Sequence, residues 1–185
     1  MVDLIFEESG RPDSRAEKGC PNQILGAGST SALIFLTCRS PQVYAVGTYL
    51  DPLAMSMVKS QGEAEVKKAL LDPNYPRVIR IVMNRDLSSE KYTAAIVESL
   101  EPRMQGQDLG SLEEFKKLNP PVDLVAGAEI EMTVRGDLLL YKNALGGLGQ
   151  IRSAVFTRAL CDVFYGEEAV SPTHLRDVLA GVPTL

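Results

Sequence analysis

Few side chains in this sequence can combine into a general catalytic site. A Ser-His-Asp arrangement needs a histidine that reaches a nucleophile and is oriented by a carboxylate. The chain has one histidine, His174, near the start of the predicted final helix, and we interpret it as a surface residue of that helix. The three cysteines, Cys20, Cys38 and Cys161, are scattered and lack the close spacing of zinc ligands. We therefore expect each cysteine to be a small buried residue and predict no metal site.

Two glycine-rich stretches can be compared with phosphate-binding loops. Gly26-Ala27-Gly28 precedes an apolar, strand-like segment, so it lacks the helix N-terminus that a dinucleotide fingerprint uses. Gly146-Gly147-Leu148-Gly149 precedes a predicted helix and could form an anion nest, but it lacks the Lys-Ser/Thr of a P-loop. We favour a simple helix-entry turn at this second stretch. The sequence therefore predicts no nucleotide and no cofactor.

The composition is that of an ordinary globular chain. Of 185 residues, 45% are hydrophobic and 23% are charged, and the formal net charge of −5 disfavours nucleic acid, which needs a basic face. No apolar run reaches the ~20 residues of a membrane span, and the first ten residues lack the pattern of a signal peptide. The cysteine usage indicates a reducing compartment. We expect an intracellular protein, in the cytoplasm or, if a transit peptide has been removed, in a plastid.

The elements that would position these side chains follow an irregular order. Strand patterns occur at Leu4–Glu7, Ala32–Cys38, Val43–Leu50, Arg77–Met83, Ala128–Val134 and Leu138–Lys142. Helical patterns occur at Pro52–Ser60, Glu63–Leu71, after Ser88 or Ser89, at Ser111–Leu118, at Gln150–Tyr165 and after Ser171-Pro172, with Pro102–Gly110 as a loop. This order predicts one α+β domain over residues 1–185, with a large antiparallel sheet covered on one face by helices.

Two of these elements have informative faces. In the helix after Ser89, one stripe is predicted to be buried and consists of Tyr92, Ala95, Ile96, Ser99 and Leu100. In Ala128–Val134, Glu129 and Glu131 alternate with apolar residues, which is typical of a half-solvated strand. We assign the two glutamates to the solvated face rather than to a catalytic carboxylate pair.

Three collinear segments resemble the chalcone isomerase family. Gly26-Ala27-Gly28 and, after one strand, Val43–Asp51 (VYAVGTYLD) are similar to the family's N-terminal signature. Glu90-Lys91-Tyr92 lies where the active-site tyrosine helix begins, and Ala159–Pro172 (ALCDVFYGEEAVSP) is similar to the penultimate helix and the start of the last one. The resemblance covers nearly the whole chain. It implies an open-faced β-sandwich with a ligand cleft between the sheet and the helices.

The resemblance also implies which residues would face a ligand. The family contains isomerases, fatty-acid-binding proteins of plastids and non-catalytic relatives that assist flavonoid synthesis. Tyr92 keeps the family's tyrosine and would be the catalytic residue of an enzyme. Thr30 falls at the isomerases' anion-binding arginine, and Tyr44 replaces their strand threonine, as in the fatty-acid-binding branch. The other ligand-facing positions also depart from the isomerase pattern: Met83 replaces a lysine, Ser99 an asparagine and Val163 a threonine.

The missing arginine matters most for an enzymatic function. A neutral hydroxyl at Thr30 cannot replace the bidentate hold of a guanidinium on an anion. The loss of one such donor costs about 3 kcal/mol of transition-state stabilisation. Arg39 and Arg80 are the candidate replacement cations. The preferred interpretation of Arg80, which lies between Ile79 and Ile81, is a residue on the open solvent face of the sheet.

The sequence is therefore compatible with three functions. The leading one is a non-catalytic or weakly catalytic protein that binds a fatty acid or similar amphiphile, with Tyr44 and Tyr92 as polar anchors. The alternative is an isomerase that closes a chalcone-like ring by intramolecular oxa-Michael addition, with a relocated cation. The third is a fold that has lost its ligand and acts through protein contacts. The sequence makes no prediction of the oligomeric state.

Overall fold

The computed structural model describes residues 43–58 and 60–182. Within this part of the chain, five strands form one sheet in which every neighbouring pair is antiparallel. The strands lie side by side in chain order: β1 (Tyr44–Leu50), β2 (Arg77–Met83), β3 (Glu129–Arg135), β4 (Leu138–Lys142) and β5 (Leu148–Arg152). The predicted strands Leu4–Glu7 and Ala32–Cys38 lie outside the described residues.

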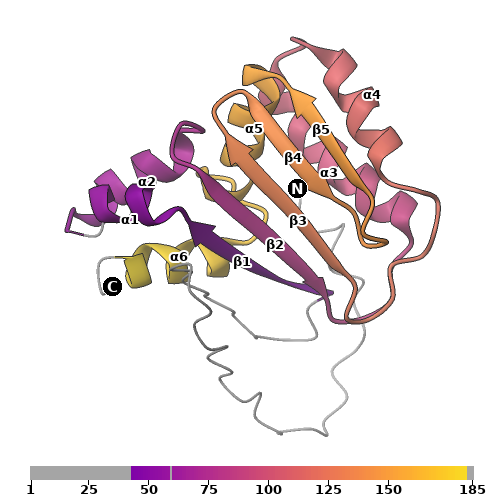
Figure 1. Cartoon of the computed structure of the whole chain (residues 1–185), viewed down its shortest axis with the longest axis horizontal. Helices are drawn as coiled ribbons and strands as arrows, with labels where there is room; N and C mark the ends of the chain where they lie inside the picture. The colour runs from indigo at the N-terminus through magenta and orange to yellow at the C-terminus, as the bar shows by residue number, and fades with distance from the viewer. Residues whose placement is uncertain (1–42, 59, 183–185) are drawn as a thin grey trace, which may run out of the picture.

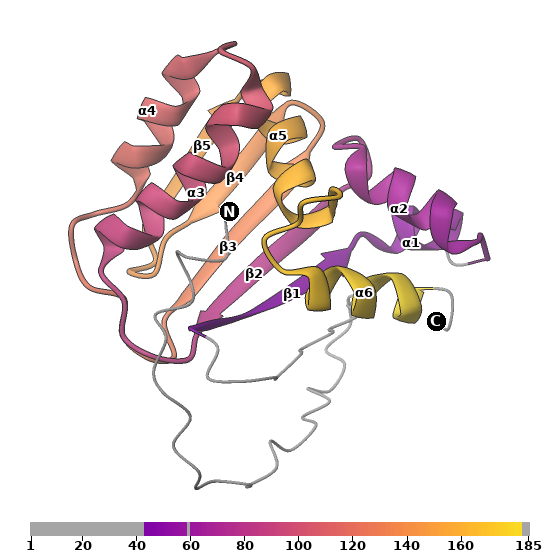
Figure 2. The ribbon, with the colours of Figure 1, turned by 180° about the vertical axis from the view of Figure 1, so that it is seen from behind.

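The helices of the described chain fall into three pairs. They are α1 (Pro52–Val58) and α2 (Glu63–Leu71) between β1 and β2, α3 (Ser89–Met104) and α4 (Leu109–Leu118) between β2 and β3, and α5 (Ala154–Tyr165) and α6 (Pro172–Gly181) after β5. In Figure 2, α3, α4, α5 and α6 lie in front of the sheet. Figure 1 shows the opposite face, on which none of the helices of the described residues lies. The predicted α+β sheet with helices on one face is confirmed.

The alternation of side chains along β2 defines the two faces of the sheet. Arg77, Ile79, Ile81 and Met83 are buried toward the helices, whereas the residues between them are only half-buried. The register carries this pattern to the other strands, because residues paired across an antiparallel ladder point to the same face. We call the helix side of the sheet the covered face and the other side the open face.

The core lies between the covered face and the helices. It contains the apolar rows of all five strands, and aromatic rings join α4 to β4 and α5. The Phe115 ring meets the Tyr141 ring edge-on, with 5.2 Å between centroids, and lies 5.8 Å from the Phe156 ring. Cys161 is fully buried on α5, as predicted. No helix of the described residues is long and apolar enough to cross a membrane.

The prediction of one long helix over Gln150–Tyr165 was wrong. Residues Leu148–Arg152 form β5, and the helix begins only after Ser153, whose Oγ accepts a hydrogen bond from the Phe156 amide. The glycine-rich stretch before it is the turn of the β4–β5 hairpin, with Gly146 at a φ of 81°. It therefore does not open a helix, and the interpretation as a helix-entry turn was wrong too.

Several other boundaries also differ from the prediction. Three elements nevertheless have the predicted bounds: the strands Arg77–Met83 and Leu138–Lys142 and the helix Glu63–Leu71. The strand β3 is shifted by one residue from its prediction. The predicted loop Pro102–Gly110 is shorter, because α3 continues through Pro102 to Met104 and α4 begins at Leu109. Pro102 is tolerated because the carbonyl it leaves unbonded, on Glu98, lies on an exposed part of the helix where water can replace the bond.

Candidate functional site

Three of the predicted ligand-facing residues meet at one end of the covered face. Tyr44 of β1 and Met83 of β2 are paired in the sheet register, and both point toward the helices. Tyr92 lies in the first turn of α3 and is only 2% exposed. Thr30 and Arg39 lie outside the described residues.

The start of α3 places Tyr92 over the sheet. The predicted buried stripe of this helix is confirmed, and the helix begins after Ser88. Ser88 has the extended backbone of an N-cap, but its side chain makes no capping hydrogen bond. Ser89 instead donates from its Oγ to the Pro120 carbonyl over 2.7 Å. This bond ties the start of α3 to the segment after α4, so the position of Tyr92 depends on both helices.

Tyr92 belongs to a group of three phenols, with Tyr44 and Tyr141. Burial raises the pKa of Tyr44 and of Tyr141 to about 12. Burial also raises the pKa of Tyr92 well above its ordinary value, with smaller contributions from the other two phenols. All three hydroxyls are therefore protonated donors at neutral pH.

The hydrogen bonding of this tyrosine group is incomplete. Tyr141 donates from its Oη to Asn119 Oδ1 over 2.6 Å. The Tyr92 hydroxyl is close enough to Tyr141 for each phenol to affect the other's pKa. No hydrogen bond of normal length and angle joins them, however, and Tyr92 Oη has no such partner among the described residues. Tyr141 was not singled out from the sequence, where it is one of several apolar or aromatic residues in β4.

Ser99 and Val163 are part of the helical layer. Ser99 lies about two turns further along α3 than Tyr92, and its Oγ donates to the Ala95 carbonyl over 2.9 Å. Val163 is fully buried on α5, which packs against α3. The hydroxyl of Ser99 is thus already bonded within its own helix, and the structure does not bring Val163 into the tyrosine group.

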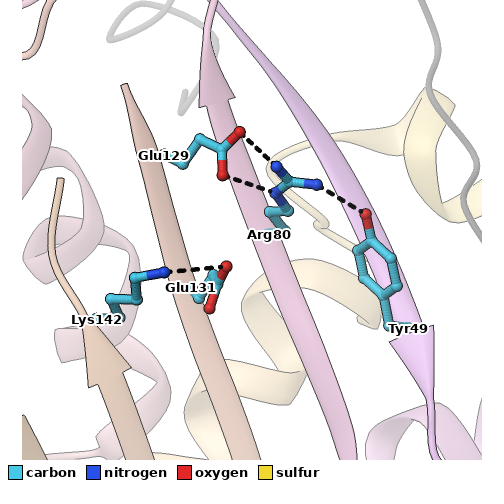
Figure 3. A network of polar contacts seen from close by, with 5 residues as sticks. All are labelled: Tyr49, Arg80, Glu129, Glu131 and Lys142. Atoms are coloured by element: carbon cyan, nitrogen blue, oxygen red, sulfur yellow. Dashed lines mark hydrogen bonds and ion pairs between the residues drawn. The ribbon is translucent and has the colours of Figure 1, made fainter. Parts of the chain in front are cut away.

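Arg80 points away from the tyrosine group. Its side chain lies on the open face, as preferred from the sequence, and Figure 3 shows the guanidinium between Glu129 of β3 and Tyr49 of β1. It donates from Nε to Glu129 Oε2 over 3.2 Å, from Nη2 to Glu129 Oε1, and from Nη1 to Tyr49 Oη over 3.3 Å. The hydrogen bonds from Arg80 lower the pKa of Glu129. Arg80 is therefore not placed to replace a cation on the covered face.

The prediction that His174 is a surface residue was wrong. The side chain is 1% exposed, and its Nε2 lies 2.9 Å from Thr48 Oγ1, which is also 2.8 Å from Tyr165 Oη. Its Nδ1 has no hydrogen-bond partner among the described residues. Burial lowers the pKa of His174 to about 4. The helical spacing of His174, Val178 and Leu179 is the signal that could have placed His174 on the buried face of α6.

Arg77 is a second buried polar residue that sequence reasoning missed. It lies on the covered face next to Leu50, and its guanidinium donates to the carbonyls of Ala69, Leu70, Asp72 and Tyr75. Its Cζ lies 5.3 Å from the centroid of the Tyr165 ring. This arginine adds hydrogen bonds to carbonyls at the end of α2 and in the turn that follows, where the regular helical bonding stops. Its hydrogen bonds are thus used within the protein.

Three of the hollows on the described surface are large enough for a small ligand. One, of about 530 Å³, is a groove between α3 and the end of α4, which we call the α3–α4 groove. Its lining includes Ala94, Val97, Pro121 and Asn119, the residue that accepts the hydrogen bond of Tyr141. The second, of about 650 Å³, lies where the end of α2 meets the start of α5, and the third, of about 490 Å³, lies between the end of α3 and α5. Of these three, only the groove reaches a described residue that is bonded to the tyrosine group.

The comparisons with known proteins identify the class of fold. No family model and no curated protein matches the sequence. Among solved structures, the chain is similar to the fatty-acid binding protein AtFAP1 of Arabidopsis thaliana, with a TM-score of 0.65 and 20% identity. The alignment covers 85% of this chain and 90% of that one. The chain therefore has the chalcone isomerase-like α+β fold that its three collinear segments predicted.

Proposed function

We propose that this protein binds a fatty acid or a similar amphiphile between the covered face and α3, with Tyr92 and Tyr44 as polar anchors. The observation that carries the proposal is the Tyr92 hydroxyl, which is buried and has no hydrogen-bond partner of normal geometry among the described residues. A buried polar group without a partner costs about 1–3 kcal/mol. A ligand head group that accepts a hydrogen bond from Tyr92 would remove that cost.

The surroundings of Tyr92 suit an amphiphile. The adjacent covered face is apolar and contains Met83 and Met132, whose unbranched side chains can adapt to an alkyl chain. The α3–α4 groove brings a partly apolar surface up to Asn119 and so offers a route from the solvent toward Tyr141 and Tyr92. A solved protein of the same fold is a fatty-acid binding protein, which further supports this class of ligand.

The isomerase alternative gains no such support from the described residues. The reaction needs a cation to hold the phenolate of the substrate. Arg80 lies on the open face and Arg77 is hydrogen-bonded to four carbonyls. Binding of an amphiphile is therefore the function that this arrangement supports best.

Calorimetric titration of the purified full-length chain with dodecanoic acid and with 1-dodecanol tests the proposal. At least one of the two is expected to bind with one-to-one stoichiometry. Tyr92→Phe is expected to weaken that binding roughly fivefold, because one hydrogen bond contributes about 1 kcal/mol. Tyr49→Phe removes a phenol from the open face and is the matched control.

Two results would count against the proposal. Absence of binding by both amphiphiles would overturn the function itself. Equal affinities for the unsubstituted chain and Tyr92→Phe would refute the anchoring role of Tyr92. Thermal unfolding of both variants checks that the phenylalanine substitutions leave the fold intact.

A further inference from the structure

The electrostatic surroundings of the tyrosine group differ from those of a carboxylate-binding site. Burial raises the pKa of Tyr44, Tyr92 and Tyr141, and no cationic side chain lowers the pKa of Tyr92. A cation close to a phenol favours the phenolate and lowers the pKa. The Tyr92 hydroxyl is thus a donor in a poorly solvated region, without positive charge from the described residues.

The two arginines of β2 are committed elsewhere. Arg80 forms a bidentate ion pair with Glu129 on the open face. Arg77 is on the covered face, but its guanidinium is bonded to the end of α2 and stacked over Tyr165. Moving either one toward Tyr92 would break several of these bonds. An ionised carboxylate beside Tyr92 would therefore be desolvated without a compensating charge from the described residues, which is costly.

The α3–α4 groove carries a negative rim. Glu90, Glu98 and Glu101 line it along α3, and Lys116 is the one cation among its lining residues. Lys116 is already paired with Glu113, with 2.6 Å between Nζ and Oε1. A carboxylate ligand that approached Asn119 through this groove would be repelled by the glutamates, whereas an uncharged amphiphile would not.

We infer that the ligand of this site carries an uncharged polar head group, such as an alcohol, an ester or a protonated carboxylic acid, and approaches through the α3–α4 groove. This inference rests on the proposed function and specifies its ligand class. The head group accepts a hydrogen bond from Tyr92, and its alkyl portion lies on the apolar part of the groove and the covered face. The site would then select uncharged head groups over ionised carboxylates because burying a charge is costly, and not because a charged side chain binds the head group.

Titration of the full chain with two ligands of equal chain length tests the inference. At pH 7.5, 1-dodecanol is expected to bind at least tenfold more tightly than dodecanoate. As the pH is lowered to 5.5, the affinity for dodecanoic acid is expected to rise, because a growing fraction of the acid is protonated, while that for dodecanol stays constant. Both ligands are used below the concentrations at which they aggregate.

Charge substitutions in the groove provide the second arm of the test. Glu98→Gln combined with Glu101→Gln is expected to strengthen dodecanoate binding about threefold or more and to leave dodecanol binding nearly unchanged. Glu65→Gln, an exposed substitution on α2 that lies outside the groove, is the control and is expected to change neither affinity.

The outcomes separate this inference from the proposed function. Two results would overturn the inference of an uncharged head group while the amphiphile-binding function stands. One is that dodecanoate binds as tightly as dodecanol at pH 7.5. The other is that Glu65→Gln strengthens dodecanoate binding as much as the groove variant does. Absence of binding by either ligand would overturn both. A tenfold preference for dodecanol that shrinks in the groove variant would support the inference.

Discussion

His174 Nε2 lies 2.9 Å from Thr48 Oγ1, so the last described helix is hydrogen-bonded to the first described strand. Thr48 also contacts the Tyr165 hydroxyl at 2.8 Å. One threonine thus joins β1, α5 and α6, which are far apart in sequence. Because all three side chains are buried, the free energy of each hydrogen bond depends on the others being made.

The first prediction concerns the pH dependence of folding. The folded-state pKa of His174, about 4, lies below its ordinary value of 6.5. Between these values the unfolded chain binds a proton that the folded chain does not, so the stability is complete above about pH 6.5 and falls as the pH decreases toward 4. The total loss is on the order of 3 kcal/mol. His174→Gln, which does not titrate, is expected to flatten this part of the profile.

The measurement is the free energy of unfolding in urea at several pH values between 7.5 and 4.5. The carboxylates, including Glu129, titrate in both proteins, so the difference between the two profiles isolates His174. Parallel profiles for the unsubstituted chain and His174→Gln would show that the pKa of His174 does not rise on unfolding, contrary to the expectation.

The second prediction concerns Thr48. Thr48→Val keeps the shape of the side chain but leaves the Tyr165 hydroxyl and the His174 ring without their common partner. We expect a loss of about 2–3 kcal/mol in the free energy of unfolding. Thr133→Val makes the same substitution on the open face of β3 and is expected to change the stability by less than about 0.5 kcal/mol. Similar effects of the two substitutions in denaturant titrations would argue against a stabilising role for the Thr48 contacts.

The third prediction concerns the end of α2. Arg77→Met keeps much of the apolar volume but removes the donors to the carbonyls of Ala69, Leu70 and Asp72. We expect a loss of about 3 kcal/mol, since the variant loses several hydrogen bonds from one buried charged donor together. Hydrogen exchange is expected to accelerate in α2 and in the following turn more than in β4. Uniform acceleration across the sheet would indicate global destabilisation instead, and Arg135→Met, on the exposed end of β3, is the control.

The fourth prediction concerns the open face. The Arg80 and Glu129 side chains remain 29% and 41% exposed, so their ion pair is screened by water. A double-mutant cycle with Arg80→Gln and Glu129→Gln is expected to give a coupling energy below about 1 kcal/mol. Arg80→Gln is also expected to leave amphiphile affinity unchanged, because its side chain lies opposite to Tyr44. A clear loss of affinity in this variant would place Arg80 in the binding machinery after all.

Much of the fold was predictable because its signals are local. The strand at Arg77–Met83 and the helical stripe from Tyr92 to Leu100 depend only on local residue types and spacing, and both were confirmed. The prediction of one helix over Gln150–Tyr165 was wrong because it, too, used local signals alone. Isolated spacing does not separate a short strand followed by a capped helix from one longer helix, and only pairing of Leu148–Arg152 with β4 resolves this.

The sequence by itself determined where most strands and helices lie and that Tyr92 faces inward, because backbone periodicity sets which side chains share a face. Only the tertiary structure decided which buried polar groups find partners. His174 meets Thr48 and Arg77 meets the end of α2, whereas the hydroxyl of Tyr92 has no bonded partner among the described residues. These pairings join segments distant along the chain, and their geometry is set by how the helices pack on the sheet, which no local pattern encodes.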